Sequence, residues 1–368
     1  EALGAGDQVH RSAREMLYHF EAIPHLTRWL RLMDANRTKE GAFRTGPTST
    51  QVASVASDAA IIVHHPVWWM SGDAAYPKER WKHYDDHRIM RDTKDRKFHG
   101  TAWGEVKGTE GMTAEFLDLC YLGFTNRLIR ELAVPAQQPL NAIRFQDYAA
   151  RIRKGFQLRF WQPGSSLAQK SQSAQVLALR SAVLKPEQQQ TVIDKLTASL
   201  AKDGLQVGPI GAHFLPGVLS LTGNQETAVK ILAKLDDEQK KAFLGNGIAE
   251  WFMAYLAGID AVIPGFQQVR IAPRIPKDDS VKWIKAAYES PKGKVSVHWQ
   301  KRKDGGLQVD FTIPAGMLGR LELPAPKDAK ILEGGKPLSE IPFLEVAKRG
   351  DDQVDLISGS GSYSLVIQ

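Results

Sequence analysis

The apolar positions of the chain follow two different periods, and the change between them lies near residue 264. Before it, apolar residues recur every three or four positions, which places them on one face of a helix. One such face runs through residues 9–20 and a second through residues 26–33, with Pro24 in a first helical turn, where proline is tolerated. The first part of the chain is therefore predicted to be helical.

Further helices are predicted between loops rich in glycine, proline and asparagine. Pro186 stands just inside a helix start, and Gly204 and Gly223 stand where helix C-termini favour a left-handed residue. The predicted ranges are 50–70, 112–133, 143–157, 168–184, 187–202, 210–222, 225–235 and 242–258. About ten sequential helices without a fixed repeat period favour a toroid of helical hairpins over a solenoid.

After residue 264, apolar and polar residues alternate and β-branched residues are frequent. "KVSVHWQ", "LQVDFTI" and "SYSLVIQ" have the period of strands, and "KDGG" and "GSGS" are turn signals between them. The predicted fold class is therefore mainly α with a β domain. A helical toroid is expected over residues 1–263, with too few helices for a closed twelve-helix barrel, and a β-sandwich over residues 264–368.

Composition limits the classes of function. With 368 residues and 43% hydrophobic content, the chain can bury a large core. No run reaches the ~18 apolar residues of a membrane span. The net charge of +7 is diluted along the chain, which disfavours nucleic acid and suits an anionic ligand such as an acidic polysaccharide equally well. The lone Cys120 excludes an internal disulfide and is predicted to be buried. Neither compartment nor oligomeric state follows from the sequence.

Carboxylates and aromatic residues at loop–helix junctions are candidates for chemistry on sugars, because glycosidases use paired acids and stacking rings. Glu1 and Asp7 flank the turn "LGAG", Asp58 starts an apolar helical run, and Trp103 and Glu105 lie in a glycine-flanked loop. Asp7 is equally well placed to cap the following helix. Asp58, taken alone, reads more readily as a helix-start acid than as a ligand.

Signatures of metal binding and of a nucleophile are weak. His83 and His87 are four residues apart in "HYDDH", but no third ligand follows, so a solvated charged turn is the simpler interpretation. His64 and His65 lie in an apolar run and are interpreted as core or interface histidines whose hydrogen bonds are satisfied. The sequence has no glycine-rich phosphate loop and no serine nucleophile elbow. No metal and no cofactor is therefore predicted.

The order of several motifs resembles that of the bacterial α-L-rhamnosidases, glycoside hydrolase family 78. The opening "EALGAGDQVHRSAREML" is similar to the family's acid followed by "LGW-x-GD" and a long helix. "ASDAAIIVHHPVWWMSGD" is similar to its "WGDAAVIVPW…YGD", and "HGTAWGEV" to its Gly-Trp loop. The most specific piece, "GIAEWFMAYLAGIDAVIPGFQQVRIAPRIP", resembles the junction between barrel and sandwich.

This resemblance covers nearly the whole chain. It implies an (α/α)6 barrel followed by a β-sandwich, and inverting hydrolysis of terminal α-L-rhamnosyl residues from a rhamnose-containing glycan or glycoside. The family motif places Glu1 at the general acid, Asp7 at a carboxylate that holds sugar hydroxyls, Asp58 at a second substrate-binding carboxylate in the pocket wall and Trp103 at a sugar-stacking position. Glu105, in the same loop as Trp103, is also predicted to bind substrate.

Departures from the family pattern keep other functions open. Ala5 and Ala56 stand at positions that are aromatic in the family. A short linker with the acids Asp236, Asp237 and Glu238 replaces the family's "TTIWE" segment, whose Glu is the general base, and these acids read more readily as a solvated loop. The alternatives are a non-catalytic relative that binds a carbohydrate or a partner, a sequence from which segments have been omitted, and a lyase acting on a rhamnose-containing acidic glycan.

Overall fold

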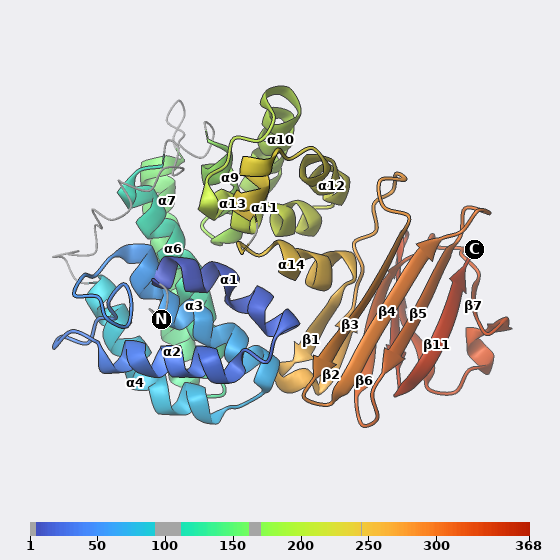
Figure 1. Cartoon of the computed structure of the whole chain (residues 1–368), viewed down its shortest axis with the longest axis horizontal. Coiled ribbons are helices and arrows are strands. Elements are labelled where there is room, and N and C mark those ends of the chain that lie inside the picture. The colour runs from blue at the N-terminus through green and yellow to red at the C-terminus, as the bar shows by residue number, and fades with distance from the viewer. Residues whose placement is uncertain (1–4, 93–111, 162–170, 244) are drawn as a thin grey trace. The chain divides into compact units, whose positions relative to one another are not determined.

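The structure is a computed structural model that describes residues 5–92, 112–161, 171–243 and 245–368 (Figure 1). Contacts divide the chain into two compact units. The first unit comprises Glu1–Val67, Ala74–Val218 and Ile231–Ile248, and the second comprises Trp68–Asp73, Leu219–Lys230 and Ala249–Gln368. Among the helices of the described ranges, none has both the length and the apolarity needed to cross a bilayer.

The helices follow the periodicity of the sequence closely. Their bounds are α1 Gly6–His19, α2 Ile23–Ala35, α3 Ser54–Ser71, α4 Ala75–Asp92, α6 Ala114–Ala133, α7 Pro139–Phe160, α9 Gln172–Arg180, α10 Pro186–Asp203, α11 Pro209–Leu221, α12 Gln225–Ala233, α13 Asp237–Phe243 and α14 Ile248–Trp251, which continues as a π-helix over Phe252–Leu256. The buried stripe of α10, for example, is Val192, Leu196 and Leu200, spaced by four residues.

Two helices were not predicted. The interpretation of "HYDDH" as a solvated turn is wrong, because His83 and His87 lie on α4 and His87 is only 1% exposed. The linker that carries Asp236 and Asp237 contains α13, so its interpretation as a loop is also wrong. The expectation of too few helices overlooked both elements.

Contacts within the first unit link its helices into a ring. α1 approaches α3 so closely that a Cβ on Gly6 would fall on the carbonyl of Ala56. Ser54 of α3 donates a hydrogen bond to Asp118 of α6 at 2.7 Å. α6 in turn meets the end of α9, where a Cβ on Gly123 would lie 2.5 Å from the carbonyl oxygen of Ser181. Small residues at these crossings therefore allow close helix packing.

The ring continues from α9 to α11 and back to α1. Ser173 of α9 accepts a hydrogen bond from the backbone N–H of Gly208, directly before α11, at 3.1 Å. His213 of α11 bonds the backbone carbonyl of Asn246 at 3.0 Å. The next residue, Gly247, donates its N–H to Glu15 of α1 at 2.7 Å. The turn at residues 245–247 therefore completes the ring within the first unit.

The second unit contains the predicted β-sandwich. Its sheets have the strand orders β1-β2-β6-β10-β9 and β3-β4-β5-β11-β7-β8. The strands are β1 Ile259–Ile263, β2 Gln268–Ile271, β3 Trp283–Ser290, β4 Gly293–Lys301, β5 Leu307–Ile313, β6 Leu318–Pro324, β7 Ile331–Glu333, β8 Lys336–Pro337, β9 Leu344–Arg349, β10 Gln353–Ser358 and β11 Gly361–Ile367. Alternate residues of β5 are buried, which defines one inner face of the sandwich.

Candidate functional site

Two of the five predicted site residues lie in the described part of the chain. Asp7 is in the first turn of α1, and Asp58 is in α3. Glu1, Trp103 and Glu105 lie outside the described residues. The start of α1 packs on α3 beside Asp58, so the first turns of these two helices are neighbours.

Asp7 does not cap α1. The N-cap position belongs to Ala5, whose side chain makes no capping hydrogen bond. Asp7 instead pairs with Arg11, one turn further along the helix, with 3.5 Å between Oδ2 and Nη1, and its side chain remains 27% exposed. A carboxylate in a first turn is stabilised by the helix dipole. The remaining exposed oxygen surface of Asp7 is available to accept hydrogen bonds from hydroxyl groups.

Arg11 connects Asp7 to the turn at residues 245–247. Its Nε donates to Asn246 Oδ1 at 2.7 Å. Gly247 has φ of +92°, and a Cβ there would lie 2.7 Å from His213 Nδ1. Glycine is therefore required at this position for two reasons, its left-handed backbone and the contact with the imidazole.

Two histidines and a tyrosine lie next to this pair. His10 Nδ1 is 3.1 Å from the Gly6 carbonyl oxygen, and His10 Nε2 is 3.2 Å from the Tyr121 hydroxyl. The carbonyl can only accept, so Nδ1 carries the proton and Tyr121 donates to Nε2. The ring of His213 is 6.1 Å from that of His10. Helices α1, α6 and α11 therefore contribute to one cluster.

The groups of this cluster are uncharged near neutral pH. Burial, reinforced by the charge of Arg11, lowers the pKa of His10 well below its ordinary value. Burial lowers the pKa of His213 to about 3 and raises the pKa of Tyr121. The cluster therefore places neutral, internally bonded groups beside the charged pair of Asp7 and Arg11, and the exposed part of the Asp7 carboxylate is what a sugar hydroxyl could reach.

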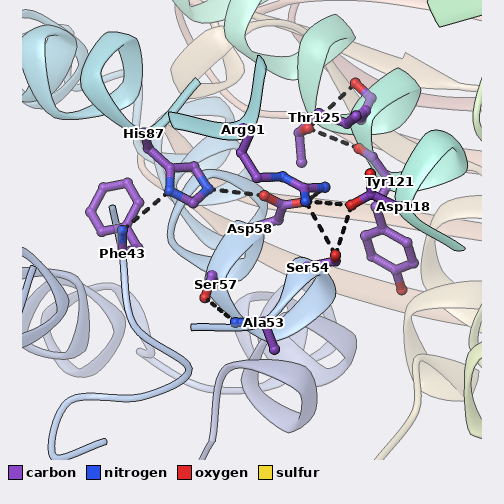
Figure 2. Close-up of polar contacts among 11 residues, drawn as sticks. Phe43, Ala53, Ser54, Ser57, Asp58, His87, Arg91, Asp118, Tyr121 and Thr125 are labelled. Atoms are coloured by element: carbon purple, nitrogen blue, oxygen red, sulfur yellow. Dashed lines mark hydrogen bonds and ion pairs between the residues drawn. The ribbon is translucent and has the colours of Figure 1, made fainter. Parts of the chain in front are cut away.

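Asp58 is the centre of a second, buried network (Figure 2). Its carboxylate is 1% exposed and bonds His87 Nε2 at 2.9 Å and Arg91 Nη2 at 3.2 Å. The backbone N–H of Phe43 donates to His87 Nδ1 at 3.2 Å, so the proton of this imidazole is on Nε2 and points at Asp58. Both oxygens of Asp58 are thus engaged by side chains of α4.

The network extends from α4 to α6, as Figure 2 shows. Arg91 also forms an ion pair with Asp118, and Ser54 accepts from Arg91 at 3.1 Å. Burial acts to lower the pKa of Arg91, but Asp58 and Asp118 more than offset it, so this pKa is raised. Burial lowers the pKa of His87 despite the opposing effect of Asp58. Two carboxylates, one guanidinium and a neutral imidazole hold α3, α4 and α6 together.

The acids of the linker have structural partners. Asp236 Oδ1 accepts from the N–H of Gln239 at 2.8 Å, and the Gln239 side chain accepts from the N–H of Asp236 at 3.2 Å, which is a reciprocal cap of α13. The Asp237 side chain is 90% exposed and lies 3.2 Å from Lys240. The observed geometry explains these two carboxylates without a catalytic role.

The structure also locates the single cysteine and the adjacent histidines His64 and His65. Cys120 is buried and not in a disulfide, as predicted, and burial raises the pKa of its thiol. His64 is buried, but neither ring nitrogen has a hydrogen-bond partner, so the prediction of a satisfied histidine is wrong for His64. His65 bonds Glu131 at 2.6 Å. Within the described ranges, no three His, Cys, Asp or Glu side chains are grouped to hold a metal ion. A cavity of about 910 Å³ is lined by sandwich residues only.

Sequence reasoning missed most of the cluster around Asp7. His10 and Arg11 follow Asp7 by three and four residues, so helical spacing alone places them on the same face, and this signal was present. Tyr121 and His213 had no such signal, because they reach His10 from helices more than a hundred residues away.

Known families match both parts of the chain. Residues 1–248 match the family model described as the bacterial alpha-L-rhamnosidase 6 hairpin glycosidase domain, and residues 258–336 match the bacterial alpha-L-rhamnosidase C-terminal domain. An alpha-L-rhamnosidase of Streptomyces avermitilis is 23% identical, over 88% of this chain and 35% of its own length. One from Alteromonas sp. (strain LOR) is 21% identical, over 73% of this chain and 34% of its own length. The chain spans about a third of these relatives.

Solved structures have the same fold. The S. avermitilis alpha-L-rhamnosidase complexed with L-rhamnose has a TM-score of 0.85 at 20% identity, covering 100% of this chain and 38% of that one. The alpha-L-rhamnosidase from Dictyoglumus thermophilum has a TM-score of 0.84 at 17% identity, covering 99% and 46%. By the family models, which together match most of its length, the chain belongs to the bacterial α-L-rhamnosidase family, with the six-hairpin glycosidase domain followed by the C-terminal domain.

Proposed function

We propose that the chain carries the catalytic domain of an inverting α-L-rhamnosidase-like glycoside hydrolase, which releases terminal α-L-rhamnosyl residues from a glycan or glycoside. The observation that carries the proposal is the placement of Asp7. Its carboxylate is partly exposed and held by Arg11, next to a buried cluster of His10, Tyr121 and His213 from three helices. The family match and the L-rhamnose complex of one relative support the sugar class.

In this mechanism Glu1 is the general acid that protonates the leaving glycosidic oxygen, and a second carboxylate activates water on the opposite face of the sugar. Asp7 accepts hydrogen bonds from sugar hydroxyls. Trp103 stacks on the C–H surface of the ring, and Glu105 binds substrate beside it. Asp58 supports the pocket wall through α3, because Arg91 and His87 engage its carboxylate. The toroid predicted over residues 1–263 is the proposed catalytic domain, except that β1, Ile259–Ile263, pairs with β2 and belongs to the sandwich that continues over residues 264–368.

The proposed base is not one of the first two linker acids. Asp236 caps α13, and Asp237 pairs with Lys240 in solvent. Inversion requires an acid and a base about 6.5–9.5 Å apart, with water between the base and the anomeric carbon. The base is therefore expected on an element that faces Glu1 across the sugar.

Hydrolysis of an aryl α-L-rhamnoside tests this function. The wild-type chain should release the aryl group, and Glu1→Gln should lower kcat by about a hundredfold or more, because general acid catalysis contributes about 10²–10⁴-fold. Asp7→Asn should chiefly raise KM. Proton NMR of the first product should show the β-anomer for an inverting reaction. A wild-type rate no higher than that of Glu1→Gln would refute the catalytic proposal.

The second candidate is a non-catalytic relative that binds a rhamnose-containing ligand. It is favoured by the turn at residues 245–247, which is fixed by Arg11, Glu15 and His213, because the family resemblance implies a longer segment with the general base in this part of the chain. This candidate predicts that calorimetry detects binding of L-rhamnose, weakened by Asp7→Asn, in a protein that hydrolyses no rhamnoside. Turnover by the wild type that Glu1→Gln abolishes would exclude it.

A further inference from the structure

The outer face of the six-stranded sheet carries an exposed tryptophan. Trp283, the first residue of β3, is 61% exposed, whereas Trp29, Trp251 and Trp299 are at most 2% exposed. β3 is an edge strand of this sheet and pairs only with β4 in it. Trp283 lies on the solvent side, because Trp299 on the neighbouring strand points into the core. A large aromatic ring exposed to solvent can be stabilised by a ligand that packs on it and buries its apolar surface.

A row of polar side chains continues from this tryptophan across the sheet. Strand register places Lys285, His298, Asp310 and Ser364 opposite one another on β3, β4, β5 and β11. The ring of Trp283 meets that of His298 edge to face, with 6.4 Å between centroids. Since neighbouring strands lie about 4.8 Å apart, the row crosses three inter-strand spacings of one flat surface.

Hydrogen bonds preorganise this row. Asp310 accepts from the Ser364 hydroxyl at 2.6 Å and from Gln308 Nε2 at 3.1 Å, and it lies 3.4 Å from His298 Nδ1. Gln300 in turn donates to Gln308 at 3.1 Å. Gln308 Nε2 also lies 3.3 Å from the second carboxylate oxygen, and the Asp310 side chain is still 35% exposed, so a donor from outside could reach it by replacing one of these contacts. Amide, carboxylate and hydroxyl groups held beside an aromatic ring are the groups that recognise a pyranose.

The charges on this face select among ligands. Two cations, Lys285 and Lys294, stand beside two carboxylates, Glu289 and Asp310, so the face has no net charge. A phosphate backbone or an anionic membrane needs a positive field, which this face does not provide. A neutral saccharide needs a stacking ring and polar groups with directed hydrogen bonds, and both are present.

We propose that the outer face of the β3-β4-β5-β11 sheet, centred on Trp283 and Asp310, is a binding surface for a neutral oligosaccharide or polysaccharide. The proposal goes beyond the hydrolytic function and does not depend on it. Trp283 stacks on the C–H face of one sugar, and Asp310, His298 and Gln300 bond hydroxyls of that sugar or its neighbours. The surface would hold a polymer and leave turnover of small rhamnosides unchanged.

Affinity gel electrophoresis of the full chain tests the proposal, with polyrhamnose, xyloglucan and arabinogalactan as the probes cast into native gels. Retardation of the wild type by at least one of these polymers is expected. Trp283→Ala should weaken retardation by about tenfold, and Trp283→Phe should retain part of it, because a stacking ring remains. Phe343→Ala is the matched control, since Phe343 is an exposed aromatic of the same unit at 78% exposure.

The outcomes separate this surface from the proposed active site. The proposal is supported if Trp283→Ala loses retardation while its rate on an aryl rhamnoside stays that of the wild type. It is equally supported if the wild type hydrolyses no rhamnoside but is retarded, and Trp283→Ala is not. An unretarded wild type overturns the proposal, as does a Trp283→Ala variant that is retarded like the wild type. Sedimentation velocity tests whether a second copy of the chain binds this face instead of a glycan. Self-association that Trp283→Ala abolishes, without glycan binding, would assign the face to a second copy of the chain and overturn the proposal.

Discussion

Replacement of Arg91 by methionine would leave two carboxylates without their cation in the interior of the helical unit. The guanidinium is 1% exposed and serves both Asp58, at 1%, and Asp118, at 7%. Removing one partner of a buried ion pair costs about 3–5 kcal/mol, because the remaining charge is buried without a counter-charge. Methionine preserves the volume of the side chain, so little of the loss comes from a cavity.

The expected effect is large enough to measure directly. At roughly 2–4 °C per kcal/mol for a domain of this size, Arg91→Met should lower Tm by about 6–20 °C. Urea unfolding followed by far-UV circular dichroism gives the free energy of unfolding. Arg159→Met is the matched control, because its pair with Glu115 is 40% and 46% exposed and such pairs contribute about 0–1 kcal/mol.

Neutralising the acids should reverse the loss. A triple variant with Arg91→Met, Asp58→Asn and Asp118→Asn removes all three charges and should recover most of the lost stability, since it leaves no unpaired buried charge. The single variant Asp58→Asn then separates two roles of this acid. A structural carboxylate predicts lower stability, and a sugar ligand predicts a higher KM at unchanged stability. Arg91→Met with the stability of Arg159→Met would refute the reasoning.

Two further predictions concern packing and pH. Gly123→Ala in α6 should destabilise the protein by about 1–3 kcal/mol, because the new Cβ would lie 2.5 Å from the Ser181 carbonyl oxygen. Gly155→Ala in α7, where the nearest contact of a Cβ is at 3.8 Å, should stabilise it by about 0.5–1 kcal/mol. Equal effects of the two substitutions in urea unfolding would contradict this. Burial lowers the pKa of His10 and of His87 in the folded protein, so as the pH falls these histidines are protonated first in the unfolded chain. The free energy of unfolding should therefore keep its full value above about pH 6.5 and fall below that pH by about 1.4 kcal/mol per pH unit for each histidine. Unfolding curves that coincide between about pH 7 and pH 5.5 would contradict this.

Periodicity predicted the helices and strands where packing is apolar, and failed where it is not. The sandwich follows from alternation because its inner faces are aliphatic and aromatic. The buried side of α4 instead consists largely of polar and charged residues. They are Arg80, Tyr84, His87, Arg88 and Arg91. A hydrophobic pattern cannot detect such a face, because a buried guanidinium is tolerated only when another element supplies its carboxylate. For Arg80 that carboxylate is Asp34, at 2.6 Å.

The same dependence on distant partners limits how far the site could be predicted. An acid at the start of a helix is compatible with a cap, a ligand or an ion pair, and the local sequence of Asp7 and Asp58 does not distinguish them. Their partners do. Asp7 meets Arg11 on its own helix and keeps an exposed carboxylate, whereas Asp58 meets Arg91, 33 residues away, and is enclosed. Two acids with the same sequence signal therefore differ in exposure: in the proposed site Asp7 binds the sugar directly, whereas Asp58 acts through the helices that it joins.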